Sequence, residues 1–480
     1  MNHSPIHGCE SFRALSSPAF LTRRQMLQRA AAGFGAIAFA ALAHEDAQAQ
    51  AARQSPLDPR PTHFPAKAKR VIYLQLEGGM ASQDTFDYKS ELNRRDGQDP
   101  PAWAGPSNKT PKLLGSPFKW NRHGNSGLWI SDCFQHTARH ADDLCVISSL
   151  YHGTNDHNQA ILHMHTGDAR NPRPCFGSWI TYGLGSEARD LPGFVVINPV
   201  NAPANSRSGF LPDVFTATPL RDIGRAGASP VPDLAINRRT LDQQRRQLTL
   251  IQERNRRYAE RSPDDSRLDA VIESYERGFL MQQAYPDVLN IYQEPRETLA
   301  MYGLDQSGAG PRLAQQILLA RRMIERGVRF VEIGDHAWDT HLNLRVELPR
   351  VTGGLDQPLA ALLTDLKRRG MFEDTLVVIG GEFGRTSAGE IGMNQPPGRD
   401  HNCRGFTWVL AGGGVKGGFK YGGTDELGFA AVENRCQVHD LYATMLHLLG
   451  MDHRRMTYRY AGRDFTLPDV HGDVIREIVA

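Results

Sequence analysis

Cysteine is scarce in this sequence, and no two cysteines form a C-x-x-C pair. The chain has six cysteines among 480 residues, at spacings that match neither a zinc knuckle nor a disulfide framework. A chain of this length buries enough apolar surface to be stable without disulfides. A small scaffold held together by disulfides or zinc is therefore excluded. The composition is that of an ordinary globular protein, with 40% hydrophobic and 22% charged residues.

The sequence also has no large excess of positively or negatively charged residues. Lys and Arg total 55 against 53 Asp and Glu, so no global field attracts nucleic acid or an acidic membrane surface. Residues 238–261 are rich in arginine, but acidic residues are interleaved with it, which favours a solvated helix face over a nucleic-acid contact. We therefore expect no nucleic-acid partner.

Long apolar runs are missing beyond the N-terminal region. Residues 30–43 are mostly apolar but too few to cross a bilayer. Arg23 and Arg24 precede this run, and Ala47-Gln48-Ala49 follows it as a signal-peptidase site. The pattern predicts a twin-arginine signal peptide over residues 1–49, with an amphipathic helix as the alternative. It also predicts the twin-arginine export machinery as a partner, a periplasmic or otherwise extracytoplasmic location, and no membrane span in the mature chain.

The rest of the sequence alternates between short apolar runs and helical patterns. Residues 50–69, rich in Pro, Arg and Ala, are typical of a linker, and residues 70–480 form the predicted domain. Residues 201–306 have a different, helical pattern and predict an insertion. Apolar runs of the kind found in strands buried on both faces of a parallel sheet occupy residues 71–76, 144–150, 194–197, 328–333, 376–379 and 408–411. Together with a helical pattern at residues 311–326, they predict an α/β fold with a doubly wound, mostly parallel sheet and helices on both faces.

Carboxylate and imidazole side chains follow several of these strands. They include Glu77, Asp84 and Asp87 after the first run, His152 to His157 after the second, Asp335 to His341 after the fourth, and Glu382, Asp400 and His401 after the fifth. Because ligands of open α/β sheets bind beyond the carboxyl ends of the strands, we expect these groups to converge. Mixed Asp, Glu and His ligation without cysteine suits Zn, Mn or Ca, so the sequence predicts one or two divalent metal ions. Alternatives stay open for Asp84 and Asp87 as helix caps and for Asp335 and His336 as ordinary loop residues.

Longer stretches of the sequence carry a resemblance to a known family. They are Asp84-Thr85-Phe86-Asp87, residues 177–185, Trp338-Asp339-Thr340-His341, Glu382-Phe383-Gly384-Arg385-Thr386, Gly398-Arg399-Asp400-His401-Asn402, residues 410–418 and His439-Asp440-Leu441-Tyr442-Ala443-Thr444. Over nearly all of its mature length the chain resembles the bacterial family known as domain of unknown function 1501. Members of that family are exported by the twin-arginine route and are related to the alkaline phosphatase and sulfatase superfamily.

The resemblance implies an alkaline-phosphatase-like fold and a two-metal site that cleaves phosphate or sulfate esters, with a small anionic ester as substrate. It implies that Asp339, His341 and His401 hold one ion. Glu382 and Glu77 would hold a second or shared ion, and Asp84 is a further candidate ligand from its place after the first strand. Arg385 would orient an anionic group through its planar fork of donors. His439 is expected to be structural.

Departures from the superfamily pattern concern the nucleophile. The chain has no C/S-x-P-x-R motif, so it is not an ordinary sulfatase. The residue about nine positions before Thr166-Gly167, where the superfamily carries a hydroxyl, is His157, and Thr154 would serve only with a rearranged helix start. Phe383 replaces the histidine of the second Asp-His pair.

Three interpretations of the site are therefore open. His157 is a further metal ligand, with a metal-bound hydroxide as the attacking group. Alternatively, His157 is itself the nucleophile. In the third interpretation the protein is a non-catalytic periplasmic metal-binding, anion-binding or assembly protein that retains the fold.

Overall fold

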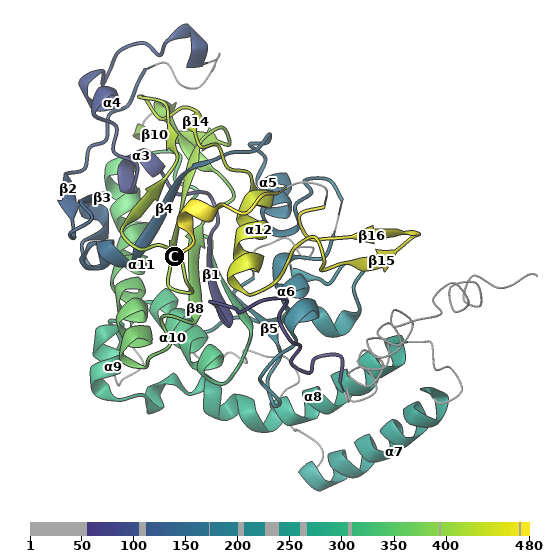
Figure 1. The fold of residues 1–480 in the computed structure, drawn as a ribbon. Helices are drawn as coiled ribbons and strands as arrows, with labels where there is room; N and C mark the ends of the chain where they lie inside the picture. Colours follow the sequence, from purple (N-terminus) through teal and green to yellow (C-terminus); the bar gives the residue numbers. More distant parts are fainter. Residues whose placement is uncertain are drawn as a thin grey trace, which may run out of the picture. The chain divides into compact units, whose positions relative to one another are not determined.

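An eight-stranded sheet forms the centre of a computed structural model of the protein (Figure 1). The structure describes residues 55–104, 112–171, 173–199, 206–225, 240–259, 266–305, 310–392, 395–469 and 472–480, which belong to the unit Ser55–Ala480. The predicted signal peptide and residues 50–54 of the predicted linker lie outside the described residues.

The strand order of the sheet is β12-β4-β11-β8-β1-β7-β5-β6. The bounds are β1 Arg70–Leu76, β4 Leu144–Leu150, β5 Phe194–Ile197, β6 Thr218–Leu220, β7 Phe330–Asp335, β8 Thr375–Gly380, β11 Phe406–Ala411 and β12 Phe419–Tyr421. β11 is antiparallel to both of its neighbours, and the other pairs are parallel. Each apolar run singled out in the sequence coincides with or overlaps one of these strands, which confirms the predicted mostly parallel α/β sheet.

Both faces of the sheet are covered by helices because its central strands are apolar on both sides. In β1, Ile72 and Leu74 contribute to one buried cluster, while Val71 and Tyr73 contribute to another. Helices α10 (Arg312–Glu325) and α11 (Leu344–Arg368) supply the first cluster. Helices α5 (His157–Thr166), α6 (Phe176–Leu184) and α12 (Val438–Leu448) supply the second and lie across the sheet from α10 and α11 in Figure 1. The predicted helices on both faces are thus confirmed.

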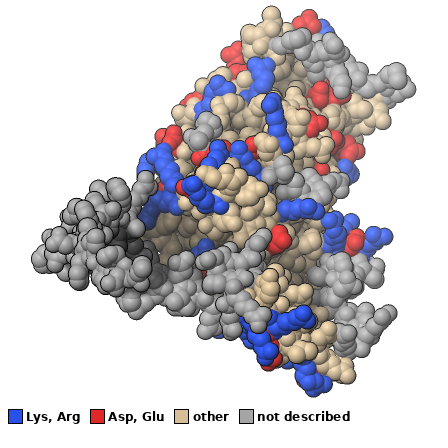
Figure 2. All heavy atoms as spheres, turned by 90° about the vertical axis from the view of Figure 1, so that its right-hand side faces the viewer, with Lys and Arg blue, Asp and Glu red and all other residues tan. Residues whose placement is uncertain are grey.

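The predicted helical insertion contains the helices α7 (Leu241–Ala259), α8 (Ser266–Leu289) and α9 (Arg296–Met301). It also contains the edge strand β6, which the sequence pattern did not indicate. The C-terminal half of α8 is buried in the core through Tyr285 and Val288, whereas α7 contacts α8. Acidic side chains are interspersed among the basic ones on the face drawn in Figure 2. Arg245 of α7, for example, forms an ion pair with Glu276 of α8.

Residues 55–69 were predicted as part of a linker. Their backbone is hydrogen-bonded to the ends of two helices: the N–H of Arg60 donates to the carbonyl of Leu184 (2.9 Å), and that of Lys67 donates to the carbonyl of Leu448 (2.8 Å). Leu57 and Ala68 are buried. This segment therefore packs as part of the α/β unit.

The remaining elements are short and lie mostly at the ends of the sheet. They are α3 Ser82–Thr85, α4 Ser90–Arg94, β2 Trp120–His123, β3 Leu128–Ser131, β9 Gly384–Gly392, β10 Gln395–Asn402, β13 Gly423–Thr424, β14 Ala431–Glu433, β15 Tyr458–Tyr460, β16 Arg463–Phe465 and seven-residue or shorter 3-10 turns. The β9–β10 hairpin leaves the carboxyl end of β8. Because β1, β4, β7 and β8 run in the same direction, the segments that follow them all start at one rim of the sheet.

No disulfide joins the cysteines of the described residues. Cys133, Cys145, Cys175, Cys403 and Cys436 are all free thiols, and all but Cys133 are buried. None of the helices formed by the described residues is long and apolar enough to cross a membrane.

Candidate metal centre

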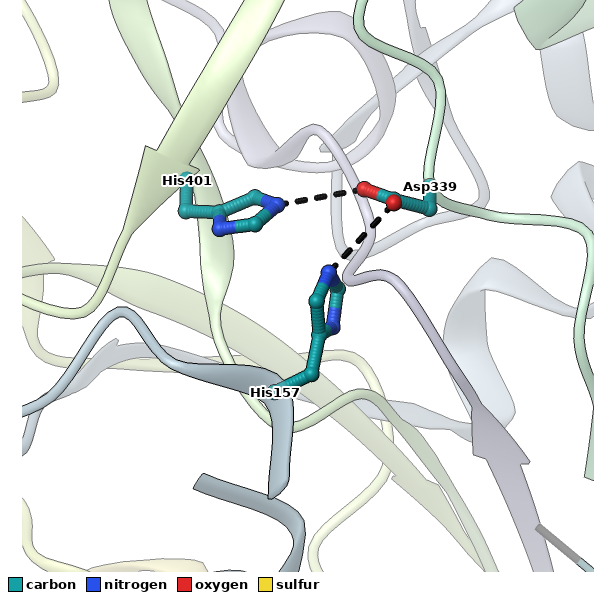
Figure 3. Close-up of side chains that lie close together, drawn as sticks. All are labelled: His157, Asp339 and His401. Carbon is teal, nitrogen blue, oxygen red and sulfur yellow. Dashed lines mark hydrogen bonds and ion pairs between the residues drawn. The ribbon is translucent and has the colours of Figure 1, made fainter. Parts of the chain in front are cut away.

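Three histidines surround the carboxylate of Asp339 at this rim of the sheet. His157 is the first residue of α5, Asp339 and His341 follow β7, and His401 lies on β10. The Oδ1 atom of Asp339 is 2.9 Å from Nε2 of His341 and 3.1 Å from Nε2 of His401. Its Oδ2 atom is 3.4 Å from Nε2 of His157 (Figure 3). Segments far apart in the sequence thus place three imidazole nitrogens around one carboxylate.

The other ring nitrogen of each histidine faces an acceptor outside the cluster. Nδ1 of His157 lies 2.7 Å from Oε1 of Glu382, and Nδ1 of His341 lies 2.5 Å from Oε2 of Glu390. Nδ1 of His401 lies 2.9 Å from the backbone carbonyl oxygen of Asn155. Carboxylates and carbonyls only accept hydrogen bonds, so each Nδ1 carries a hydrogen. Each Nε2 atom then faces the cluster, where it can hold either a proton or a metal ion.

A cation is needed to balance this arrangement. The Nε2 atoms of His341 and His401 are 3.0 Å apart, and two lone pairs beside a carboxylate repel one another unless a proton or a metal ion lies between them. Two overlapping sets of groups lie close enough to hold an ion, His157 with Asp339 and His401, and His341 with Asp400 and His401. Nitrogen and oxygen donors without a thiolate fit Zn or Mn, and the imidazoles disfavour Ca, which prefers oxygen ligands.

The protonation of the cluster follows from the same contacts. The hydrogen bond to Asp339, followed by that to Glu382, raises the pKa of His157 to about 10 against the effect of burial. The hydrogen bond to Asp339 also raises the pKa of His341. Burial opposes the ionisation of Asp339, but hydrogen bonds from the three histidines and Arg385 outweigh it and hold the pKa of this carboxyl well below its usual range. Asp339 is therefore the permanent negative charge of the site.

Glu382, predicted as a ligand, lies behind His157 rather than beside Asp339. Its side chain is fully buried. Its Oε1 atom accepts from the backbone N–H of Gly78 (2.9 Å) as well as from His157, and its Oε2 atom accepts from Nε2 of Gln75 (3.3 Å). A carboxylate that holds the far nitrogen of a histidine is the usual support of a metal-ligating imidazole. Glu382 is thus placed to orient His157.

Arg385, predicted to bind an anionic group, is buried and already surrounded by acceptors. Its Nη2 atom donates to Oδ1 of Asp339 (2.6 Å) and to the carbonyls of Gly78 and Trp338, and its Nη1 atom donates to the carbonyl of Arg399. These contacts occupy the guanidinium, which fastens Asp339 to the neighbouring loops and is not presented to a ligand.

Glu77 and Asp84 do not join the cluster. The carboxylate of Glu77 contacts Nδ1 of His336, at the edge of the site. The carboxylate of Asp84 is held by the guanidinium of Arg399 in a two-point ion pair, with distances of 2.5 and 3.0 Å, and both side chains are fully buried. Asp84 therefore joins α3 to β10 and offers no free oxygen to an ion.

Thr154 also lies outside the cluster. Its hydroxyl donates to the side chain of Gln159 and accepts from the backbone N–H of Asp156. Asp156 caps α5 by accepting from the backbone N–H of Gln159 (3.0 Å). Because this cap fixes the helix start, His157 rather than Thr154 faces Asp339.

Phe383 packs against two of the histidines. Its ring stacks on that of His401, with centroids 4.4 Å apart and an interplanar angle of 28°, and lies 5.0 Å from that of His157. The residue is buried. Phe383 therefore makes an apolar contact with two candidate ligands.

Comparison with known proteins identifies the family. A family model described as protein of unknown function (DUF1501) matches residues 68–479. The chain belongs to the DUF1501 family. No curated protein matches the chain.

Solved structures similar to the chain have low identity and low TM-scores. The crystal structure of Ps i-CgsB in complex with k-i-k-neocarrahexaose has 11% identity and a TM-score of 0.35, over 80% of this chain and 72% of that chain. The PsFucS1 sulfatase from Pseudoalteromonas sp. has 11% identity and a TM-score of 0.34, over 80% and 68%. The lipoteichoic acid synthase LtaP from Listeria monocytogenes has 11% identity and a TM-score of 0.33, over 82% and 76%. Likeness of this degree carries no conclusion about activity.

Two features of this DUF1501 site were not predicted from the sequence. Asp400 was noted beside His401 but not assigned, and the structure places it in one of the two sets that could hold an ion. Glu390 and Asn155 support His341 and His401. The sequence offers a signal for Asp400 in its neighbour, but none for Glu390 or Asn155, since their role depends on the β9–β10 hairpin and the loop before α5.

Replacing Asp84 with Asn tests its structural role in the DUF1501 fold. The substitution leaves Arg399 buried without its counter-charge, so we expect the free energy of unfolding in urea to fall by about 3–5 kcal/mol. Bound metal should stay at the wild-type level in the folded variant. Asp99→Asn, at an exposed ion pair with Lys112, is the matched control. Loss of metal without loss of stability would instead identify Asp84 as a ligand.

Metal binding to this DUF1501 protein should release protons. In ion-free protein the pKa of His157 is raised to about 10, so a proton occupies Nε2 at neutral pH and an ion must displace it. A raised pKa stabilises the ion-free fold below the unfolded value near 6.5, and this stabilisation is lost as pH rises through about 10. Zn affinity, measured by calorimetry in buffers of different ionisation enthalpy, should therefore increase from pH 6 to 9 with net proton release. An affinity that does not depend on pH would contradict this protonation scheme.

Proposed function

We propose that this protein is an exported, metal-dependent hydrolase of phosphate or sulfate esters. The observation that carries the proposal is the convergence of three imidazole Nε2 atoms on Asp339 at the carboxyl rim of a parallel sheet. Such rims are where open α/β sheets bind their ligands. The groups come from segments after β4, β7 and β8, so the arrangement depends on the whole fold and not on one local motif.

The candidate ligands form a site that is open on one side. His157, Asp339 and His401 form one set, and His341 and Asp400 extend it toward a second position that shares His401. Asp339 is 43% exposed at its side chain, whereas Glu382 and Arg385 behind it are buried. A divalent ion bound there supplies Lewis acidity toward an ester oxygen and toward a water molecule. The exposed side of Asp339 leaves room for both.

The orientation of His157 favours one of the three interpretations of the site. Its Nδ1 hydrogen is held by Glu382 and its Nε2 atom faces Asp339, as expected of a ligand supported by a carboxylate. A nucleophilic imidazole would need Nε2 free of metal. We therefore assign His157 as a ligand and water as the attacking group, with Thr154 outside the reaction.

Export is proposed from the N-terminal sequence. Arg23 and Arg24 before a short apolar run, and Ala47-Gln48-Ala49 after it, are typical of a twin-arginine leader. That route carries folded proteins, which is compatible with a metal ion inserted before export. The proposed location is the periplasm or another compartment outside the cytoplasm.

A second candidate function is metal or anion binding without turnover. It is favoured by the side chains that contact Asp339 in the described part of the chain, which are His157, His341, His401 and Arg385. None of these carries a hydroxyl or a thiol that could attack an ester. Turnover and metal content measured on the same protein separate the two candidates.

Metal content and ester turnover should be lost together. The mature protein should contain Zn or Mn by inductively coupled plasma mass spectrometry. It should also hydrolyse at least one of 4-nitrophenyl phosphate, bis(4-nitrophenyl) phosphate and 4-nitrophenyl sulfate. Chelation should abolish turnover, and Asp339→Ala should lower both bound metal and turnover at least tenfold, whereas Asp374→Ala at a distant ion pair should not. Stoichiometric metal without turnover of any ester would favour the binding function, and folded protein without metal would refute the metal-dependent hydrolase and metal binding, leaving only anion binding.

Glu382→Gln should weaken metal binding without removing a ligand. Glutamine can still accept a hydrogen bond from His157 but does not provide the negative charge that increases the basicity of its Nε2 atom. Loss of such a supporting group typically costs about 10–100-fold in metal affinity or activity, and competition with a chromogenic chelator measures it. Complete loss of metal, equal to that of Asp339→Ala, would show that Glu382 is itself a ligand.

A further inference from the structure

A pocket of about 600 Å3 is lined by residues that neighbour the candidate ligands in the sequence, after β4 and after β10. Its walls include Tyr151, His152, His163, Arg404, Arg435 and Gln437. This volume lies in the range of small-molecule binding sites. We refer to it as the arginine pocket, because two arginines supply its charge.

The arginine pocket is connected to the metal centre by short contacts. Nε2 of His152, on the pocket wall, donates to the backbone carbonyl of Glu382, whose side chain holds His157. Arg404 follows His401 by three residues, and the backbone N–H of Cys403 between them donates to the side chain of Asn155 (2.8 Å). The segment after β4 and the chain from β10 to the turn before β11 therefore contribute residues both to the pocket and to the metal centre.

The walls of the pocket are fixed before any ligand binds. The backbone N–H of Tyr151 donates to the carbonyl of Cys436 (3.1 Å), and that of Ala431 donates to the carbonyl of Arg404 (2.8 Å). The hydroxyl of Tyr151 accepts from Nε2 of Gln437 (2.8 Å). These bonds join the end of β4, the turn before β11 and the segment after β14 into one rim.

The two arginines are held in place without a counter-charge. The guanidinium of Arg435 lies over the ring of Tyr151, 3.9 Å from its centroid, and the residue is exposed to solvent. Arg404 donates from Nη1 to the carbonyl of Ala104 (3.0 Å). Within the described residues neither guanidinium forms an ion pair with a carboxylate, and none of the residues that line the pocket is acidic. Two unneutralised guanidinium groups in one pocket attract an anion.

The histidines of the pocket add hydrogen-bonding groups but no charge. Burial lowers the pKa of His152. Burial, together with the neighbouring His152 and His439, lowers the pKa of His163 to about 4. At neutral pH the positive charge of the pocket thus comes from Arg404 and Arg435 alone, and it does not vary with pH in the physiological range.

We propose that the arginine pocket binds a second anionic group of the substrate, a phosphate, sulfate or carboxylate, while the ester to be cleaved lies at the metal centre. The substrate is then a small molecule or chain end with at least two anionic groups. That the ligand is a substrate rests on the proposed function, but anion binding by Arg404 and Arg435 does not depend on the metal.

Binding of inorganic phosphate, sulfate and glucose 1,6-bisphosphate to the full mature protein tests the proposal. Calorimetry at low ionic strength compares the wild type with the double variant Arg404→Gln/Arg435→Gln and with Asp339→Asn. The control is the double variant Arg454→Gln/Arg459→Gln, at exposed ion pairs elsewhere. The double pocket variant should bind phosphate and sulfate at least tenfold more weakly than the wild type, and the control should not.

A doubly anionic probe separates the pocket from the metal centre. Glucose 1,6-bisphosphate should bind the wild type at least tenfold more tightly than glucose 6-phosphate, and the double pocket variant should lose this preference while keeping its bound metal. Anion binding that survives in the double pocket variant and disappears in Asp339→Asn would overturn the proposal and leave the metal-centre function intact. If the wild type hydrolyses no ester but the double pocket variant loses anion binding, the result would support anion binding by the arginine pocket. The same result would count against the hydrolase function.

Discussion

The outward hydrogen bonds of three histidines determine what the centre of this protein can do. His157, His341 and His401 each give their Nδ1 hydrogen to an acceptor behind the ring, so each turns its Nε2 atom toward Asp339, where a metal ion would replace a proton. Arg385 fixes the carboxylate from the buried side. Because the supporting acceptors select the tautomers, the affinity of the site for a cation depends as much on residues that never touch the cation as on those that would.

The fold brings these groups together through the common direction of its central strands. The segments after β1, β4, β7 and β8 leave the sheet at one rim, and the loop after β1 approaches the loop after β7 without a side chain between them. Gly78 makes this approach possible: its φ is +112°, and a Cβ atom there would lie 2.1 Å from the backbone nitrogen of Asp339. The same residue donates its N–H to Glu382. One small residue thus positions both the central carboxylate and the support of His157.

Much of the fold could be predicted from the sequence because buried strands and glycine-ended helices have local patterns. Asp339 and His341 could be singled out because they follow a recognisable strand, whereas His401 lies on β10, and the assignment of all three as ligands came from the family resemblance. The antiparallel direction of β11 could not be predicted, because an apolar run does not indicate whether a strand is parallel or antiparallel to its neighbours. The support of His157 by Glu382, 225 positions away, could not be predicted either. Such pairs exist only after the sheet has formed, and Asp84 and Arg399 are another example.

The buried thiols have a consequence for a chain that is expected to change compartments. Burial raises the pKa of Cys145 and Cys175 to about 12, so almost no thiolate is present at neutral pH. Because the thiolate is the species that attacks disulfides and oxidants, these cysteines are chemically silent once the protein has folded. Burial also raises the pKa of Cys133, Cys403 and Cys436. The described cysteines of a fold completed under reducing conditions would therefore stay as thiols on entering an oxidising environment, without depending on any catalyst of disulfide formation.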